Sequence, residues 1–184
     1  MIKTKYQTVT SNYSIDLPEA FKLAKNFKLS ELANTKGDPK QAQYLITEYS
    51  MRFNELLQIF REWYARPINP TSGYRQKEYN KIIGGSDNSM HLYACAVDFV
   101  DTANNKDKKM ISNWLRILNE NRVTGSVNIY NNSGYFRYHI GAFTDVFQGK
   151  TKINLLVYTN YEHYLELLDF YGPLGVGVYY YGNL

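Results

Sequence analysis

The segment SGYRQKEYNKIIGGSDNSMHLYACAVDF, from Ser72 to Phe99, carries the strongest signal for the fold of this chain. It crowds an arginine, two adjacent glycines, a histidine and an aspartate into one short stretch. His91 and Asp98 lie seven residues apart, and that spacing does not place two side chains on one face of a straight strand. The segment is therefore either a turn-rich surface stretch or part of a metal site, and a metal site requires the chain to turn or bulge between these two residues.

The length and composition of the chain predict one soluble globular domain over residues 1–184. The chain has 184 residues, of which 44% are hydrophobic and 21% charged. Its 18 tyrosines are unusual, and each combines an apolar ring with a polar hydroxyl. The tyrosine excess therefore indicates either a surface that binds a polar ligand or a core completed by tyrosine.

The charge pattern bears on the partners of the protein. The net charge is +4 with a pI near 8.9, and the basic residues are scattered along the chain. The one dense basic run, 106–109, is predicted to be the solvated start of a helix. Proteins that bind nucleic acid concentrate their charge in a patch or stripe, so no nucleic-acid partner is expected. Mild basicity is compatible with a polyanionic surface such as a bacterial cell wall.

The single cysteine, Cys95, excludes an internal disulfide and a cysteine-rich zinc knuckle. The N-terminal segment lacks the apolar stretch of a secretory signal, and the apolar runs are far shorter than the roughly 20 residues that span a bilayer. We expect a protein made in the cytoplasm without a signal peptide and without a membrane partner.

Periodicity predicts helices in the first part of the chain and a mixture of strands and helices after it. The strongest helix prediction covers 38–64, with Asp38 as its cap and Pro39 in its first turn. A shorter helix is predicted before it at 16–27. Further helices are predicted at 75–83, 104–121 and 161–172, and strands at 93–100, 126–130, 135–143, 152–159 and 175–181. This order favours an α+β fold.

The three histidines are His91, His139 and His163. A catalytic zinc ion takes three protein ligands from histidine, aspartate and glutamate and leaves a fourth position for water. A histidine in a predicted strand, such as His139, is more commonly a hydrogen-bonded core or surface residue, and His163 is expected to be exposed. The residues alone therefore leave two interpretations open: a metal site, or histidines that make only structural or solvent contacts.

The segment resembles the signature of the zinc D-Ala-D-Ala carboxypeptidase and L-alanyl-D-glutamate peptidase family, which includes VanY-like enzymes and many phage endolysins. That signature reads S-G-Y-R, then N, then G-G, then S-x-H-x-x-G-x-A-x-D. Its counterparts here are Ser72–Arg75, Asn80, Gly84-Gly85 and Ser89–Asp98. The resemblance covers about 26–143 and includes the hairpin GSVNIYNNSGYFRYHI. It implies a hedgehog/DD-peptidase-like fold, with N-terminal helices packed on a small, mostly antiparallel sheet that carries the zinc site, completed by 144–184.

By this resemblance, His91, Asp98 and His139 are the three ligands of a Zn²⁺ cofactor. Arg75 corresponds to the arginine that holds substrate, and its guanidinium fork suits a carboxylate. The alternative for Arg75 is an ion pair that pins its loop. Ser89 corresponds to a serine beside the site, and its alternative is a hydroxyl that caps a turn.

The chain departs from the family where a proton-transferring acid is expected. In the family that acid lies three residues before or two residues after the third ligand, and Phe136 and Gly141 stand there in this chain. Neither side chain can transfer a proton, and loss of a general base costs roughly 10²–10⁴-fold in rate. The remaining candidate catalytic acids are weak ones, namely Asp145, Asp101 and Glu120.

Three further positions have structural expectations. Gly84-Gly85 are expected to allow a tight turn. Ala94 stands where the family prefers glycine, and its methyl group is either tolerated or narrows the substrate groove. Cys95 is expected to be a small buried residue rather than a metal ligand.

The resemblance implies a zinc-dependent peptidoglycan peptidase, either a D,D-carboxypeptidase or an L-Ala-D-Glu-type endopeptidase. The expected role is that of a phage endolysin or virion-associated lysin, which acts on the cell wall after release or as part of a virion. Its expected partners are bacterial peptidoglycan and, for a lysin carried in the particle, phage virion proteins. The alternative is a catalytically degenerate family member that serves as a structural or cell-wall-binding module. A third reading is a hydrolase of another amide or ester.

Overall fold

The computed structural model describes residues 7–10, 24–33, 43–101, 107–132, 135–158 and 161–181. The chain divides into two compact units, Met1–Val97 and Asp98–Leu184, and each unit is described by itself. The helix predicted for 16–27 lies mostly outside the described residues. Among the described helices, none is both long and apolar enough to cross a membrane.

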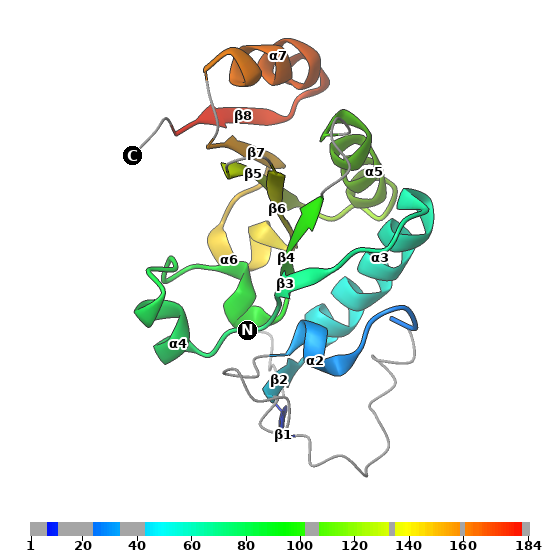
Figure 1. Ribbon diagram of the computed structural model, residues 1–184, viewed down its shortest axis with the longest axis vertical. Helices are drawn as coiled ribbons and strands as arrows, with labels where there is room; N and C mark the ends of the chain where they lie inside the picture. Colours follow the sequence, from blue (N-terminus) through cyan, green and yellow to red (C-terminus); the bar gives the residue numbers. More distant parts are fainter. Residues whose placement is uncertain are drawn as a thin grey trace. The chain divides into compact units, whose positions relative to one another are not determined.

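The first unit is built around one long helix. Strand β1 (Gln7–Thr10) pairs antiparallel with β2 (Gln43–Ile46), and helix α3 (Glu48–Tyr64) follows directly (Figure 1). A short helix, α2 (Leu29–Leu32), lies earlier in the chain. The apolar side chains of α3 recur at helical spacing and are buried, namely Phe53, Leu56, Leu57, Phe60 and Tyr64.

The predicted start of this long helix is wrong. Helix α3 begins at Glu48, whereas 43–46 forms strand β2, and the predicted cap Asp38 lies outside the described residues. The cap is Thr47, whose Oγ1 accepts a hydrogen bond from the Ser50 amide at 3.0 Å, while the Thr47 amide donates to Ser50 Oγ at 2.8 Å. This reciprocal pair satisfies two amides that the first helical turn leaves without partners. Pairing with β1, a contact distant in sequence, takes the preceding residues out of the helix.

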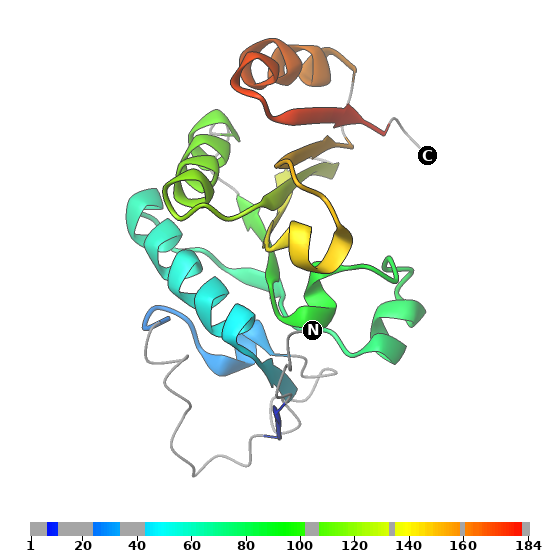
Figure 2. The ribbon, with the colours of Figure 1, turned by 180° about the vertical axis from the view of Figure 1, so that it is seen from behind.

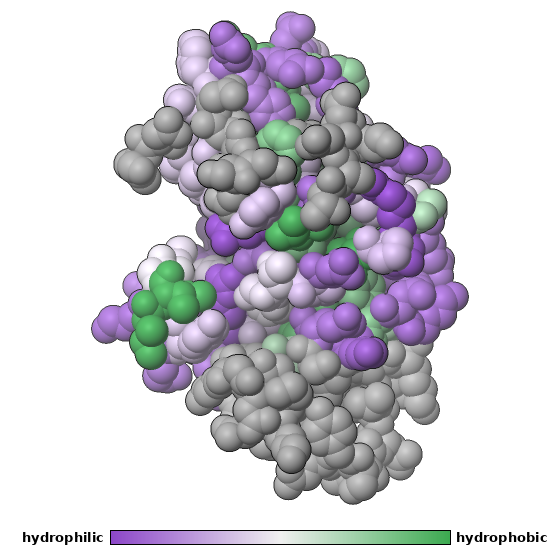
Figure 3. All heavy atoms as spheres, viewed as in Figure 1, coloured by the Kyte–Doolittle hydropathy of each residue, from purple (hydrophilic) through white to green (hydrophobic). Residues whose placement is uncertain are grey.

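The signature segment continues the first unit through β3 (Pro70–Ser72), α4 (Lys77–Ile82) and the 3₁₀ helix η2 (Met90–Tyr93). Helix α4 ends at the glycine pair, as predicted, because Gly84 has a φ of 72° that favours glycine. Asn80 closes this turn, since its Nδ2 donates to the Ser86 carbonyl at 2.8 Å. Ile82 and Ile83 are 80% and 46% exposed. Figure 3 shows a hydrophobic patch where Figure 1 places α4.

Strand β4 (Ala96–Asp101) leads into the second unit. The elements that follow are α5 (Asp107–Glu120), β5 (Gly125–Asn132), β6 (Tyr135–Ala142), α6 (Thr144–Gln148), β7 (Asn154–Val157), α7 (Tyr161–Tyr171), η3 (Gly172–Leu174) and β8 (Gly177–Tyr180) (Figures 1 and 2). The hydrogen-bonded strand order is β3-β4-β6-β5-β7-β8. The strands and helices predicted for this half of the chain are confirmed within small shifts of their ends.

The sheet combines antiparallel and parallel neighbours. The predicted β5–β6 hairpin is antiparallel, but β7 joins β5 in parallel and β8 joins β7 in parallel. Parallel neighbours need a crossover connection, and α7 provides the one between β7 and β8. The direction of β7 and β8 depends on these crossover connections. The alternation of residues along a strand does not predict strand direction.

One face of the sheet in the second unit forms the core. Alternate residues of its strands point to that face and are buried, namely Val127, Ile129, Tyr138, Ile140 and Leu155. Helix α5 packs there through Trp114, which is fully buried and donates from Nε1 to the Gly141 carbonyl at 3.3 Å. Tyr171 of α7 donates from its hydroxyl to the Lys108 carbonyl of α5 at 2.9 Å. The residues between these core positions point to the opposite face, and His139 is one of them.

We expect Thr47→Ala to lower the free energy of unfolding by about 1 kcal/mol, because it removes the cap of α3. Thr47→Ser keeps the hydroxyl and is the matched control, which should retain most of the stability. Urea denaturation followed by circular dichroism measures both variants. Equal midpoints for Thr47→Ala and the wild type would contradict this assignment of the helix start.

Candidate metal centre

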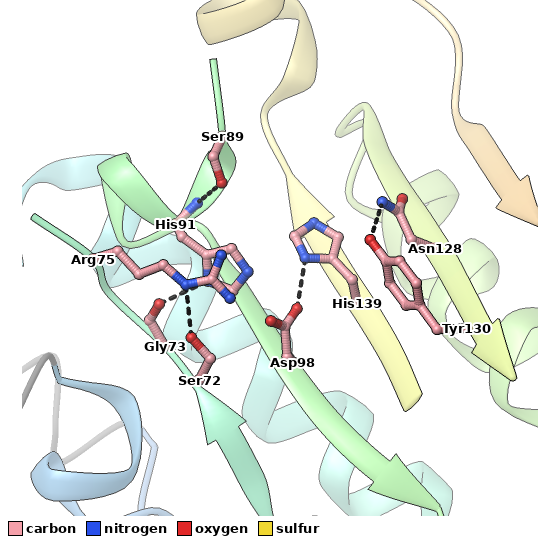
Figure 4. A network of polar contacts seen from close by, with 9 residues as sticks. All are labelled: Ser72, Gly73, Arg75, Ser89, His91, Asp98, Asn128, Tyr130 and His139. Carbon is pink, nitrogen blue, oxygen red and sulfur yellow. Dashed lines mark hydrogen bonds and ion pairs between the residues drawn. The ribbon is translucent and has the colours of Figure 1, made fainter. Parts of the chain in front are cut away.

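His91 is held by a backbone carbonyl of the signature segment. Its Nδ1 lies 2.6 Å from the carbonyl oxygen of Gly73, and the side chain is 1% exposed (Figure 4). A carbonyl oxygen only accepts hydrogen bonds, so Nδ1 carries the proton and donates. The neutral imidazole then has its lone pair on Nε2, which is the nitrogen available to a metal ion.

The carbonyl of Gly73 reaches His91 because glycine allows two segments to approach closely. A Cβ atom at position 73 would lie 2.1 Å from the carbonyl oxygen of Leu32, at the end of α2. The same oxygen accepts a hydrogen bond from the Tyr74 amide at 2.7 Å. The glycine of the S-G-Y-R motif is therefore required by packing between α2 and the strand β3 segment.

Arg75 and Ser89 are both tied to the residues around His91. The Arg75 amide donates to the His91 carbonyl at 3.0 Å, and its Nε donates to Ser72 Oγ at 2.8 Å. Ser89 Oγ accepts from the His91 amide at 3.4 Å, so this hydroxyl caps η2, as its structural alternative predicted. Contact of Arg75 and Ser89 with substrate stays a prediction.

The chain turns between His91 and Asp98, as a metal site requires. Helix η2 ends at Ala94, whose φ of 53° and ψ of 31° lie in the left-handed region. This conformation costs an L-residue roughly 1–2 kcal/mol, which explains why glycine suits the position. The Ala94 methyl group is buried and so does not line an open groove. Cys95 is fully buried, and burial raises the pKa of its thiol well above its usual range, as expected for an inert core residue.

Asp98 and His139 form the second part of the centre. Asp98 lies in β4 and His139 in β6, and His139 Nδ1 is 2.9 Å from Asp98 Oδ1. Both residues are buried, with 8% and 9% of their surface exposed. Tyr138 and Ile140 point into the core on either side of His139, and this alternation fixes the face on which the imidazole lies.

The structure brings together the three residues that the resemblance implied. One ligand atom each from His91, Asp98 and His139 lies within 4.8 Å of the other two. Two imidazole nitrogens and one carboxylate oxygen match the donor set of a catalytic zinc site with three protein ligands. A buried carboxylate is costly unless it is compensated, and a divalent cation would compensate it. The donor set therefore fits zinc, and the ligand roles stay predictions.

The three candidate acids have other interactions or face away. The Asp145 carboxylate accepts a hydrogen bond from the hydroxyl of Thr124, and Glu120 accepts one from Arg116 Nε at 2.8 Å on an exposed helix end. Asp101 lies three residues beyond the aspartate of the centre on the same strand, so it points to the opposite face. Within the described residues, no other histidine, cysteine or acid joins the group of three. The catalytic role of these acids stays a prediction.

Asn128 and Tyr130 are polar residues near the centre that sequence reasoning missed. Asn128 is the cross-strand partner of His139 and donates from Nδ2 to the Tyr130 hydroxyl at 3.2 Å (Figure 4). Its Oδ1 is buried and has no hydrogen-bond partner among the described residues. The register of the β5–β6 hairpin places Asn128 opposite His139, and a prediction of that register would have identified Asn128.

Comparison with known families places the chain in a class. The model of the family described as Peptidase M15 matches residues 25–136, and the chain belongs to this family. Peptidases of this family are generally zinc-dependent metallopeptidases, in agreement with a His-Asp-His group that can hold a metal ion. The match includes His91 and Asp98 and ends just before His139. No curated protein and no solved structure matches the chain.

We expect Gly73→Ala to weaken zinc binding by about 10–100-fold, the usual cost of losing the hydrogen-bond partner that orients a metal ligand. The new methyl group would displace the Gly73 carbonyl from His91 Nδ1. Gly84→Ala is the control, since no atom lies within 4 Å of a Cβ at that position. It adds backbone strain without touching the centre. Competition titration with a chromophoric chelator measures both, and equal zinc affinities would refute the role of the carbonyl.

Proposed function

We propose that this protein is a zinc-dependent peptidase that cleaves the stem peptides of peptidoglycan, on a hedgehog/DD-peptidase-like fold. The observation that carries the proposal is the buried group of His91, Asp98 and His139 in a chain of the M15 family. Two bonds are candidates, one cut by a D,D-carboxypeptidase and one by an L-Ala-D-Glu-type endopeptidase, and both follow from the resemblance of the signature that begins at Ser72.

A zinc ion held by His91, Asp98 and His139 would supply Lewis-acid chemistry, that is, polarisation of the scissile carbonyl and a lower pKa for the attacking water. The chain contributes the geometry. Gly73 holds the His91 ring with its Nε2 available, and Asp98 supplies the negative charge that favours a cation. The core residues on either side of His139 keep its imidazole on one face of β6, which limits the conformational freedom that the ring would lose on binding an ion.

Arg75 is proposed to bind a carboxylate of the stem peptide. Its Nε donates to Ser72 Oγ, and its amide donates to the His91 carbonyl, so both the backbone and the side chain of Arg75 are oriented. A guanidinium stays charged at every physiological pH and binds a carboxylate through two parallel hydrogen bonds. A carboxylate is present in stem peptides both at the chain end and on side groups.

The group that transfers the proton is unknown, and Asp145, Asp101 and Glu120 are its weak candidates. The variant that removes this group, among Asp145→Asn, Asp101→Asn and Glu120→Gln, is expected to lower kcat by roughly 10²–10⁴-fold, with KM nearly unchanged. The other two should retain the wild-type kcat and serve as controls for the first. Kinetics on a soluble stem peptide measure all three. Wild-type kcat in every variant would show that the proton is carried by another group.

The proposed role is that of a phage endolysin or virion-associated lysin, with bacterial peptidoglycan as its partner and virion proteins as further partners in the second case. The mild positive charge of the chain suits a polyanionic cell wall. In this proposal the protein reaches the wall after release from the host cell or as part of the particle. Its presence in purified particles, or only in lysates, separates the two routes.

A second candidate function is a degenerate module that binds the cell wall or a virion partner without catalysis. The observation that favours it concerns Phe136, at one of the positions where the family carries its acid. The Phe136 ring packs near Tyr138 and His163, with ring centroids 6.3 and 5.8 Å apart. This position is therefore used for packing and supplies no proton.

One experiment separates these two functions. We expect purified protein to hold about one zinc ion per chain and to release free amines from sacculi, and we expect His91→Ala to lose both properties, because it removes a metal ligand. Metal analysis and amine release on the same sample are the measurements. Zinc without hydrolysis would support the degenerate module, and wild-type hydrolysis by His91→Ala would refute the peptidase proposal.

A further inference from the structure

The sheet face that carries His139 continues across the second unit. His139 in β6 lies opposite Asn128 in β5, Asn128 lies opposite Leu156 in β7, and Leu156 lies opposite Tyr179 in β8. Residues opposite each other on neighbouring strands project to the same face. Tyr179 is three strand spacings from His139, about 14 Å at roughly 4.8 Å per spacing. A polymer lying across the strands would therefore contact both positions.

A pocket of about 410 Å³ opens on this face above β7 and β8. Its walls are the loop 149–152 and the side chains of Asn154, Leu156, Tyr179 and Tyr181. Two lysines of the loop, Lys150 and Lys152, add ammonium groups to the amide and phenol groups of the walls. The volume lies in the range of small-ligand sites, which is roughly 300–1,000 Å³.

Tyr181 is braced by a row of stacked groups. The Arg137 guanidinium lies over the Tyr130 ring at 4.5 Å, Tyr130 stacks on Tyr158 at 4.6 Å, and Tyr158 stacks on Tyr181 at 5.2 Å. Tyr181 ends this row beside the edge strand β8 and is 49% exposed. Such a ring is rigid, apolar on its face and polar at its hydroxyl, so binding a ligand costs it little conformational entropy.

Tyr179 is placed by a glycine. A Cβ atom at Gly177 would lie 2.7 Å from Tyr179 Cε2 and 2.9 Å from its hydroxyl oxygen, so the ring folds back over Gly177. Tyr179 is 47% exposed and forms the wall of the pocket next to Tyr181. Any side chain at position 177 would push the ring away from this place.

The lysine loop is anchored to helix α6. The Lys150 amide donates to the Thr144 carbonyl at 3.1 Å, and Thr144 Oγ1 donates to the Lys150 carbonyl at 3.3 Å. Thr144 is fully buried, so the loop backbone is fixed while the lysine side chains are exposed. Within the described part of the chain, neither Lys150 nor Lys152 forms an ion pair. Their ammonium groups are available to a ligand.

We propose that this pocket is a sugar subsite that binds the glycan strand of peptidoglycan beside the stem peptide to be cut. Sugar rings have an apolar C–H face that packs on Tyr179 and Tyr181, and their hydroxyl and acetamido oxygens accept hydrogen bonds from Lys150, Lys152 and Asn154. The inference rests on the proposed function, since the glycan is the polymer to which the stem peptide is attached. The glycan and its stem peptide are covalently joined, and one continuous sheet face presents a position for each.

The test is the binding of the full chain to peptidoglycan glycan strands from which the stem peptides have been removed. The double variant Tyr179→Ala with Tyr181→Ala is expected to bind these strands at least 10-fold more weakly than the wild type. Gly177→Ala should also weaken binding, because its methyl group displaces the Tyr179 ring. Tyr161→Ala is the control, since this tyrosine is 57% exposed on α7 and lies outside the pocket. Its affinity should equal that of the wild type.

The double variant Lys150→Gln with Lys152→Gln replaces the tyrosine variant if that variant does not fold, because both lysines are exposed. This lysine variant should weaken glycan binding several-fold. Absence of glycan binding by the wild type, or wild-type affinity in the tyrosine and Gly177→Ala variants, would overturn the inference. Binding that depends on the lysines and on low salt alone would also overturn it, because the pocket would then recognise charge only. Glycan binding does not require catalysis. Loss of glycan binding therefore tests the sugar subsite, whereas absence of amine release from sacculi tests the proposed peptidase activity.

Discussion

The hydrogen bond from His91 Nδ1 to the Gly73 carbonyl is the constraint that orients the candidate metal ligand of the first unit. It exists because glycine lets the segment after β3 come against the end of α2, where the Leu32 carbonyl also receives the Tyr74 amide. The bond selects the tautomer of His91 and leaves Nε2 for a metal ion. The same segment then orients Arg75 through Ser72 and the His91 carbonyl, so one close approach of backbone positions several functional groups.

In the second unit, the alternation of strand residues separates an apolar core face from a polar face that carries one of the candidate metal ligands. One face of β5, β6 and β7 is filled by apolar side chains under α5 and α7, whereas the other carries His139, Asn128 and the tyrosine row that ends at Tyr181. The buried His139–Asp98 pair costs desolvation that an apolar pair would avoid. A cation at this centre would offset that cost, so we expect metal binding and stability to be coupled.

The departures from the family signature now have physical meanings. At Ala94 the family's glycine suits a left-handed turn that an alanine tolerates at a cost of roughly 1–2 kcal/mol. At Phe136 a ring packs against its neighbours where the family has an acid. The first departure concerns backbone strain and leaves the metal centre intact. The departure at Phe136 concerns proton transfer alone. The family assignment therefore does not decide whether the protein is catalytically active.

The sequence by itself determined the signature segment, the family, the amphipathic helices and the β5–β6 hairpin, because these depend on local spacing and on motif residues. It also indicated His91, Asp98 and His139 as one group, although only through the resemblance. Tertiary structure alone decided the start of α3 at Glu48, the parallel direction of β7 and β8, and the place of Asn128 beside His139. Each of these depends on pairing or close approach between residues distant in sequence, and local periodicity carries no information on such contacts.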